Sequence, residues 1–169
     1  QVYHSIADER EDLTIAGCWS HARRGFADVV KAAGKKDVGI RQSVAYKSLQ
    51  LIQTMSRYEE KLAKMEPAER LEARIHYVLP LADAFFAYLK SKEGSVAPKS
   101  ATGKAIRYCL NQERFLRVFL TDGYVPMTNN AAERSIRPFT VGRNNWFQID
   151  TVSGAKASAI AYSIAETAK

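Results

Sequence analysis

The chain has 169 residues, of which 46% are hydrophobic and 25% charged, as is usual for a soluble globular protein of one domain or one domain with a small insertion. Its two cysteines exclude a disulfide framework, and no apolar run approaches the roughly 20 residues that a membrane-spanning helix needs. Residues 8–12 (DERED) are charged where a signal peptide would be apolar, so we expect a cytoplasmic protein with no membrane partner.

The first elements along the chain are a predicted strand and a predicted helix. Residues 13–18 (LTIAGC) form a short apolar run, which is typical of a buried strand. Residues 19–33 place Trp19, Ala22 and Phe26 on one face, and they predict a helix that ends at Gly34.

Two apolar stripes of helical spacing fill the middle of the chain. Their positions recur at alternating intervals of four and three residues, which indicates a long antiparallel helical hairpin over residues 40–92. Pro80 should kink or break the second helix, because proline lacks an amide donor and clashes with the carbonyl one turn back. The first stripe is Val44, Ser48, Leu51, Met55, Tyr58, Leu62 and Met65, and the second is Leu71, Ile75, Val78, Ala82, Phe85 and Leu89.

Short elements follow the hairpin. Ser100 is expected to cap a helix over residues 101–110, and residues 113–120 predict another short helix. Residues 122–123 predict a turn, and residues 124–127 an extended segment.

The last part of the chain predicts two more helices. Asn129 or Asn130 should cap the first, and Pro138 should end it, since the residue before proline avoids the α region. Residues 139–149 fit a short β-hairpin or a loop. Ser153 should cap the final helix. The expected inner face of that helix is Ala157, Ile160, Ala161, Ile164, Ala165 and Ala168.

The net charge of +7 leaves two interpretations open. Dispersed lysines and arginines make an ordinary basic surface, whereas clustered ones displace counterions from phosphate backbones and indicate a nucleic-acid partner. Basic residues gather at 23–36 and again at 134–143, the second time among asparagines and aromatic residues. The clustering favours the nucleic-acid interpretation.

Glu133 lies in the most informative stretch, residues 128–138 (TNNAAERSIRP). Its spacing from Asn130 matches a capping box, in which the glutamate serves only the helix end. The alternative is a carboxylate on the first turn of a helix, flanked by arginines that grip a phosphate backbone. Two-metal phosphoryl transfer requires such carboxylates, but one of them is not enough.

Four sequence blocks resemble, in the same order, those of transposases of the insertion-sequence-sixty-six type. The resemblance spans residues 16–169, although residues 37–95 match only in helical character. The blocks are residues 17–26 (GCWSHARRGF), 98–105 (PKSATGKA), 129–146 (NNAAERSIRPFTVGRNNW) and 162–169 (YSIAETAK).

The resemblance implies an α+β fold, predominantly α, with part of a ribonuclease-H-like core and an inserted helical hairpin. Residues 1–36 and 96–169 would belong to the core, and residues 37–95 would be the insertion. It also implies two aspartates and a glutamate that hold magnesium or manganese for cutting and joining DNA. Glu133 matches that glutamate. Both aspartates would precede Gln1, so the chain alone is expected to be inactive and to bind no metal tightly.

Cys18 and His21 have three interpretations. They can be half of a zinc site, which normally needs four ligands, or a buried thiol and a histidine bound to the backbone. The resemblance instead implies that the pair faces the catalytic pocket. Residues expected to contact DNA are Arg23, Arg24, Lys99, Lys104, Arg134, Arg137, Arg143, Asn144 and Trp146.

Three functions therefore compete. The first is a nucleoid-associated DNA transposase acting on transposon ends and target DNA, with further copies of the chain and accessory proteins of the element as additional partners. The second is a basic helical module that binds nucleic acid without catalysis, in which Glu133 is only a cap. The third is an interaction protein that uses the hairpin over residues 44–89 as a docking surface.

Overall fold

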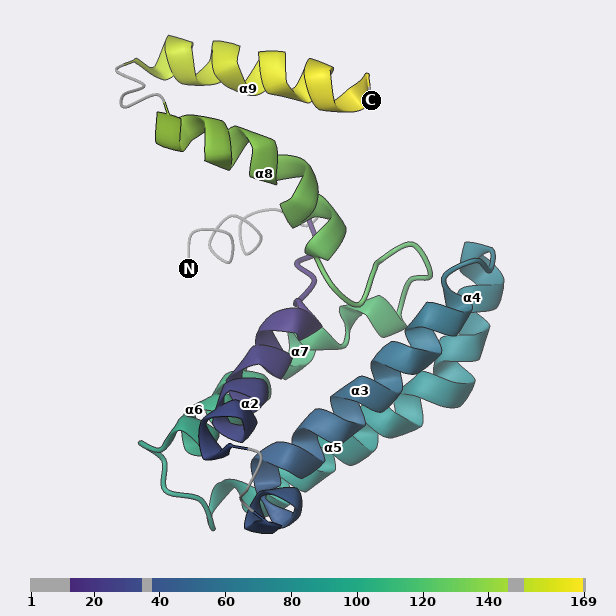
Figure 1. Ribbon diagram of the computed structural model, residues 1–169. Coiled ribbons are helices and arrows are strands. Elements are labelled where there is room, and N and C mark those ends of the chain that lie inside the picture. The colour runs from purple at the N-terminus through teal and green to yellow at the C-terminus, as the bar shows by residue number, and fades with distance from the viewer. Residues whose placement is uncertain (1–12, 35–37, 146–150, 169) are drawn as a thin grey trace. The chain divides into compact units, whose positions relative to one another are not determined.

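A computed structural model describes residues 13–34, 38–145 and 151–168 of the chain (Figure 1). The residues fall into two compact units, Gln1–Thr128 and Asn129–Lys169, and each is described by itself. Every regular element in the described residues is helical. Among these helices, none has both the length and the hydropathy needed to cross a bilayer.

The first unit is built from helices that pack around a central hairpin. In Figure 1, α3 and α5 lie side by side along their lengths, and α2 packs on both α3 and α6. The α-helices are α2 (Trp19–Ala33), α3 (Val44–Leu62), α4 (Pro67–Ala73), α5 (Leu79–Glu93), α6 (Ala101–Asn111) and α7 (Glu113–Leu116). Short turns of other helix types are η1 (Val38–Gln42), η2 (Arg74–Val78) and η3 (Val118–Leu120).

The predicted α+β fold with a ribonuclease-H-like core is wrong, because the described residues contain no strand. Residues 13–18, predicted as a strand, have no regular secondary structure. A short apolar run does not distinguish a strand from any other buried segment, and a strand needs a neighbour with which to pair. Here the run meets a helix instead: the amide of Gly17 donates to the carbonyl oxygen of Phe115 in α7 at 2.8 Å.

The helical hairpin is confirmed, and its second arm changes helix type just before Pro80, the residue that was predicted to kink or break it. The second arm is α-helical in α4, becomes a π-helical turn in η2, and resumes as α5 with Pro80 in its first turn. A π turn holds one more residue than an α turn, so it shifts the buried face by one position. Arg74 is therefore 1% exposed, whereas Ile75, predicted to be inside, is 52% exposed.

One hydrophobic core joins the hairpin to both flanking parts of the sequence. It includes Trp19 and Phe26 of α2, Phe85 of α5 and Ile106 of α6. The ring of Trp19 meets that of Phe85 edge-on with centroids 5.3 Å apart. The hairpin thus shares its core with α2 and α6. The division into residues 1–36, 37–95 and 96–169 stays a prediction.

The second unit contains α8 (Asn130–Asn145) and α9 (Val152–Thr167), which pack on each other. The prediction that Pro138 ends the first of these helices is wrong, because α8 continues through it. Proline removes one hydrogen bond and can bend a helix without ending it. Residues 139–145, expected in a β-hairpin or loop, are therefore helical, and residues 146–149 lie outside the described residues.

The cap and the inner face of the final helix differ from the prediction. The cap is Thr151, whose hydroxyl accepts from the amide of Gly154 at 3.0 Å, and not Ser153. Ile160 and Ile164 of the expected inner face are 61% and 66% exposed. The apolar periodicity identified the helix, but it does not show which face α8 covers.

Candidate functional site

The apolar and small residues at the start of α2 fix this helix against the segment around Leu116. Trp19 is 1% exposed, and its indole Nε1 donates to the carbonyl oxygen of Leu116 at 2.8 Å. A Cβ on Gly17 would come within 2.9 Å of the Leu116 amide nitrogen, so only glycine allows this close approach. Cys18 is half-buried at the N-cap position. Packing thus accounts for the glycine and the tryptophan of this sequence block.

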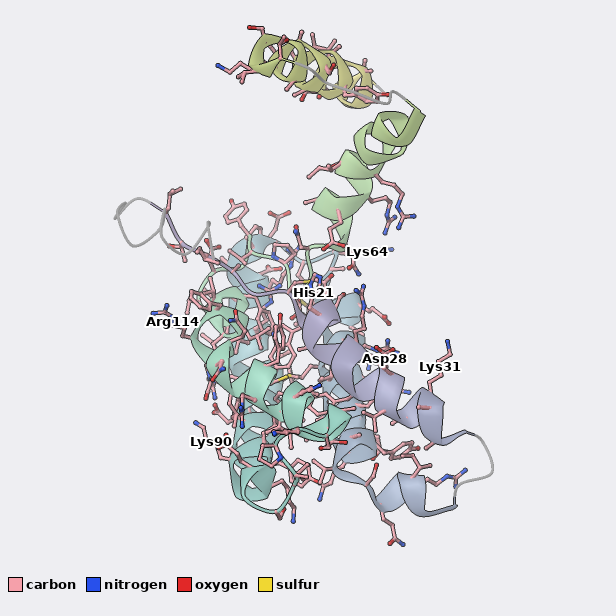
Figure 2. All side chains as sticks on the ribbon, turned by 90° about the vertical axis from the view of Figure 1, so that its left-hand side faces the viewer. His21, Asp28, Lys31, Lys64, Lys90 and Arg114 are labelled. Atoms are coloured by element: carbon pink, nitrogen blue, oxygen red, sulfur yellow. The ribbon has the colours of Figure 1, made fainter. Side chains whose placement is uncertain are left out.

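The polar members of the same block are left on the surface. His21, Arg23 and Arg24 are all exposed, and Figure 2 shows His21 near the start of α2, with Asp28 and Lys31 further along it. The backbone amide of His21 donates to the Cys18 carbonyl oxygen at 3.1 Å, as in an ordinary first helical turn. The fold makes no evident use of the three exposed side chains, which makes them candidates for binding or chemistry.

The block at residues 98–105 also contains both residues that build the fold and polar residues that remain exposed. The hydroxyl of Ser100 accepts from the Gly103 amide at 3.0 Å, which confirms the predicted cap of α6. A Cβ on Gly103 would meet the Ala97 carbonyl oxygen at 2.3 Å. Lys99 and Lys104 are exposed. The serine and the glycine thus build the helix start, and the two lysines remain available for an anionic partner.

A loop connects α7 and η3 to the second unit, and both α2 and the hairpin hold it. The amide of Trp19 donates to the carbonyl oxygen of Met127 at 3.2 Å. The guanidinium of Arg74 donates to carbonyl oxygens of Phe119, Asp122 and Val125 at 2.7–3.0 Å. Arg74 was not among the residues predicted from the sequence, since a fully buried arginine cannot be recognised from an apolar stripe. In the sequence, only Pro80 indicated that the helix near Arg74 is irregular.

Glu133 lies on the exposed first turn of α8. The helix begins at Asn130, and the amide of Glu133 donates to the Asn129 carbonyl oxygen at 2.9 Å. Asn130 is thus inside the helix, and Glu133 is its fourth residue, one beyond the position that a capping-box glutamate takes. Glu133 is therefore not in the position to form a capping box with Asn130, which was one of the two interpretations of the sequence.

Arginines expected to contact DNA accompany Glu133 on α8. Arg134 and Arg137 are exposed. Arg143 and Asn144 belong to the same helix, but their side chains lie outside the described residues, as does Trp146 altogether. Exposure is therefore established for six of the nine residues predicted to bind DNA: Arg23, Arg24, Lys99, Lys104, Arg134 and Arg137.

The second cysteine does not suit a metal. Cys109 is completely buried in the core, and burial raises the pKa of its thiol to about 12. A zinc ligand must be a thiolate, which this environment disfavours. The neighbouring Tyr108 also has a raised pKa, first because of burial and then because of the charges of Cys109 and Cys18. Cys109 is therefore a packing residue.

Comparison with known proteins identifies the family. The chain matches the family described as "Transposase IS66 family" over residues 1–157. Two uncharacterized proteins of Sinorhizobium fredii (strain NBRC 101917 / NGR234), y4qI and y4hP, are each 31% identical to it, over 159 and 162 residues. These matches cover 94% and 93% of this chain but 28% and 29% of the relatives, so the chain spans less than a third of their length. No solved structure matches. The chain belongs to the IS66 transposase family.

Proposed function

We propose that the protein to which this chain belongs cuts and joins DNA strands by metal-dependent phosphoryl transfer, and that Glu133 supplies one of its catalytic carboxylates. The main support for the proposal is the position of Glu133 in the structure. It is an exposed carboxylate on the first turn of a helix, outside the register of a capping box, with exposed arginines in the same helix. Its place in the family's sequence block supports the same role.

The residues present fit magnesium or manganese in kind. Hard divalent cations take oxygen ligands, and an accessible carboxylate such as that of Glu133 provides them. When bound, the metal ions would activate the attacking oxygen and neutralise charge on the phosphate. The other carboxylates would come from the remainder of the protein. Glu133 alone offers too few ligands, so this chain by itself is proposed to be inactive.

DNA is held in this proposal by the basic residues that packing leaves unused. Arg23 and Arg24 belong to α2, Lys104 to the first turn of α6, and Lys99 to the turn before α6, and all four are exposed. Phosphate contacts of this kind position a duplex without reading its sequence. They suit an enzyme that must accept target DNA of many sequences.

His21 is proposed to face the reacting DNA, with Cys18 behind it. The support is that His21 is exposed and lies two residues after Trp19, whose amide donates to the carbonyl oxygen of Met127. Along the chain, Glu133 follows Met127 by six residues. An imidazole in this role would donate a hydrogen bond to phosphate or orient a water molecule.

Replacing Glu133 by glutamine in the full-length protein tests the proposal. Glu133→Gln keeps the size and hydrogen-bonding capacity of the side chain but removes the charge that a divalent cation requires. Strand transfer on transposon-end DNA should be abolished, while the melting temperature and DNA affinity stay nearly unchanged. Glu69→Gln is the matched control, because Glu69 is also an exposed glutamate in the first turn of a helix, α4.

The outcomes separate the competing functions. Full strand transfer by Glu133→Gln would refute the catalytic role of this residue. Binding of DNA by the wild-type protein without any strand cleavage, in the presence of manganese, would favour the non-catalytic binding module.

A further inference from the structure

The buried guanidinium of Arg74 lies at the centre of a hydrogen-bond network that reaches the loop before α8. Its side chain is 1% exposed and forms a two-point ion pair with Glu59, with Nε–Oε1 and Nη2–Oε2 distances of 2.9 and 2.6 Å. The guanidinium also lies over the ring of Phe119, 5.2 Å from its centroid. A charge removed from water in this way is costly unless it is paired and hydrogen-bonded, and this one is both.

The third nitrogen of the guanidinium binds the loop. Nη1 donates to the carbonyl oxygens of Phe119, Asp122 and Val125 at 2.7, 2.9 and 3.0 Å. These three residues span seven positions of the chain, so their carbonyl groups converge on one nitrogen only if the chain folds back on itself. A different loop conformation would leave some of the carbonyl groups and the guanidinium without these bonds.

Arg70 strengthens the same connection one turn earlier. Its Nη1 donates to the carbonyl oxygen of Gly123 at 3.1 Å, and its other nitrogens donate to carbonyl oxygens of Leu62, Ala63 and Met65. The end of α3, the start of the second arm and the loop are thus joined by two arginines. Apolar contacts alone tolerate small shifts, whereas convergent hydrogen bonds define one conformation.

We propose that Arg74 is a positioning residue for the proposed metal site: by fixing the loop over residues 119–125, it fixes the segment from which the chain enters α8, the helix that carries Glu133. The loop is held by the Trp19 amide at Met127, and Glu133 follows six residues later. The hairpin would then hold the segment that enters α8 as well as complete the core. This inference rests on the proposed function of Glu133.

The test compares Arg74→Met with Leu89→Ala in the full-length protein. Both remove a fully buried side chain from the second arm of the hairpin, but Leu89 lies toward the far end of α5 and its apolar side chain cannot form a hydrogen bond with the loop. The measured quantity is the manganese concentration that gives half-maximal strand transfer, at a temperature well below both melting points. General destabilisation reduces the amount of folded protein but leaves this concentration unchanged.

Arg74→Met should raise the half-maximal manganese concentration by about ten-fold or more, the usual scale for losing the support of a metal ligand. Leu89→Ala should leave it at the wild-type value. Hydrogen exchange of amides 121–128 should accelerate in Arg74→Met alone. If Arg74→Met does not fold, Arg74→Lys replaces it: a lysine retains the charge near Glu59 but cannot serve that carboxylate and three carbonyl groups together.

An unchanged manganese requirement in the folded Arg74 variant, with a melting point lowered as in Leu89→Ala, would overturn the inference and leave Arg74 a structural residue. Glu133→Gln distinguishes this from failure of the proposed function. If Glu133→Gln is inactive and the Arg74 variant is normal, only the positioning role fails. If Glu133→Gln is active, the proposed function fails first.

Discussion

The contact between Gly123 and α4 predicts a large loss of stability from one added methyl group. A Cβ at Gly123 would stand 1.8 Å from the carbonyl oxygen of Pro67 and 2.6 Å from its carbonyl carbon. An unstrained carbon–oxygen contact is about 3.3 Å or longer, so the loop or the start of α4 must move by about 1.5 Å. That movement also disrupts the hydrogen bond of 3.1 Å between Arg70 and the Gly123 carbonyl oxygen.

The magnitude follows from these two effects. Overpacking of this kind costs about 1–3 kcal/mol, and each weakened hydrogen bond adds about 1 kcal/mol. Gly123→Ala should therefore lower the free energy of unfolding of the 169-residue chain by about 3 kcal/mol, and its melting temperature by about 10 °C. Thermal unfolding followed by far-ultraviolet circular dichroism measures the change.

Gly94→Ala is the matched control and should change stability in the opposite direction. A Cβ at Gly94 meets nothing within 4 Å, and its φ of −74° and ψ of −18° suit alanine. The substitution restricts the unfolded chain and should stabilise by about 0.4–1 kcal/mol. A melting temperature of Gly123→Ala equal to that of the parent chain would refute the close contact between the loop and the hairpin, and with it this account.

Two further predictions concern charge. Arg24→Gln should weaken the binding of duplex DNA equally for all sequences and reduce the slope of log affinity against log salt concentration by about one. Lys64→Gln on the hairpin is the control and should leave this slope unchanged. Equal slopes for the two variants in a salt titration would contradict the role of α2 in binding DNA. Burial raises the pKa of Glu113, but hydrogen bonds and charges from Lys90 and Arg117 outweigh it and lower the pKa below 4.5. The stability from this carboxylate is therefore fully present above the ordinary pKa of a glutamate and is lost as the pH falls through the lowered pKa of Glu113, so thermal melts of wild type and Glu113→Gln should differ at pH 7 and differ less at acidic pH.

Most helices could be predicted from the sequence because their signals are local. Residues 19–33 combine an apolar face with a terminal glycine, and the structure places α2 at Trp19–Ala33, with Gly34 at a φ of 78°. Ser100 capped its helix as expected, since capping depends on residues only three positions apart. The stripes of the hairpin likewise require no knowledge of distant residues.

The predictions that failed concern segments whose structure depends on contacts with residues far away in the sequence. Whether residues 13–18 form a strand depends on a neighbouring strand, and the described structure offers a helix end there instead. The ribonuclease-H-like core was inferred from family resemblance and not from local signals. Arg74 became a buried residue because a π turn shifted the register, and its three carbonyl acceptors lie more than forty residues away along the chain. No periodicity contains that information.

The residues of each sequence block of the family fall into two groups: those that pack in the fold and those that remain exposed. In residues 17–26 the fold uses Gly17 for close approach and Trp19 as a core anchor, while His21 remains exposed. In residues 98–105 it uses Ser100 and Gly103, while the lysines remain exposed. A short motif found by resemblance thus mixes residues that build the site with residues that would act in it. Only the second group should respond to substitution with lost DNA binding or catalysis at unchanged stability, and burial assigns each residue to a group before any mutation is made.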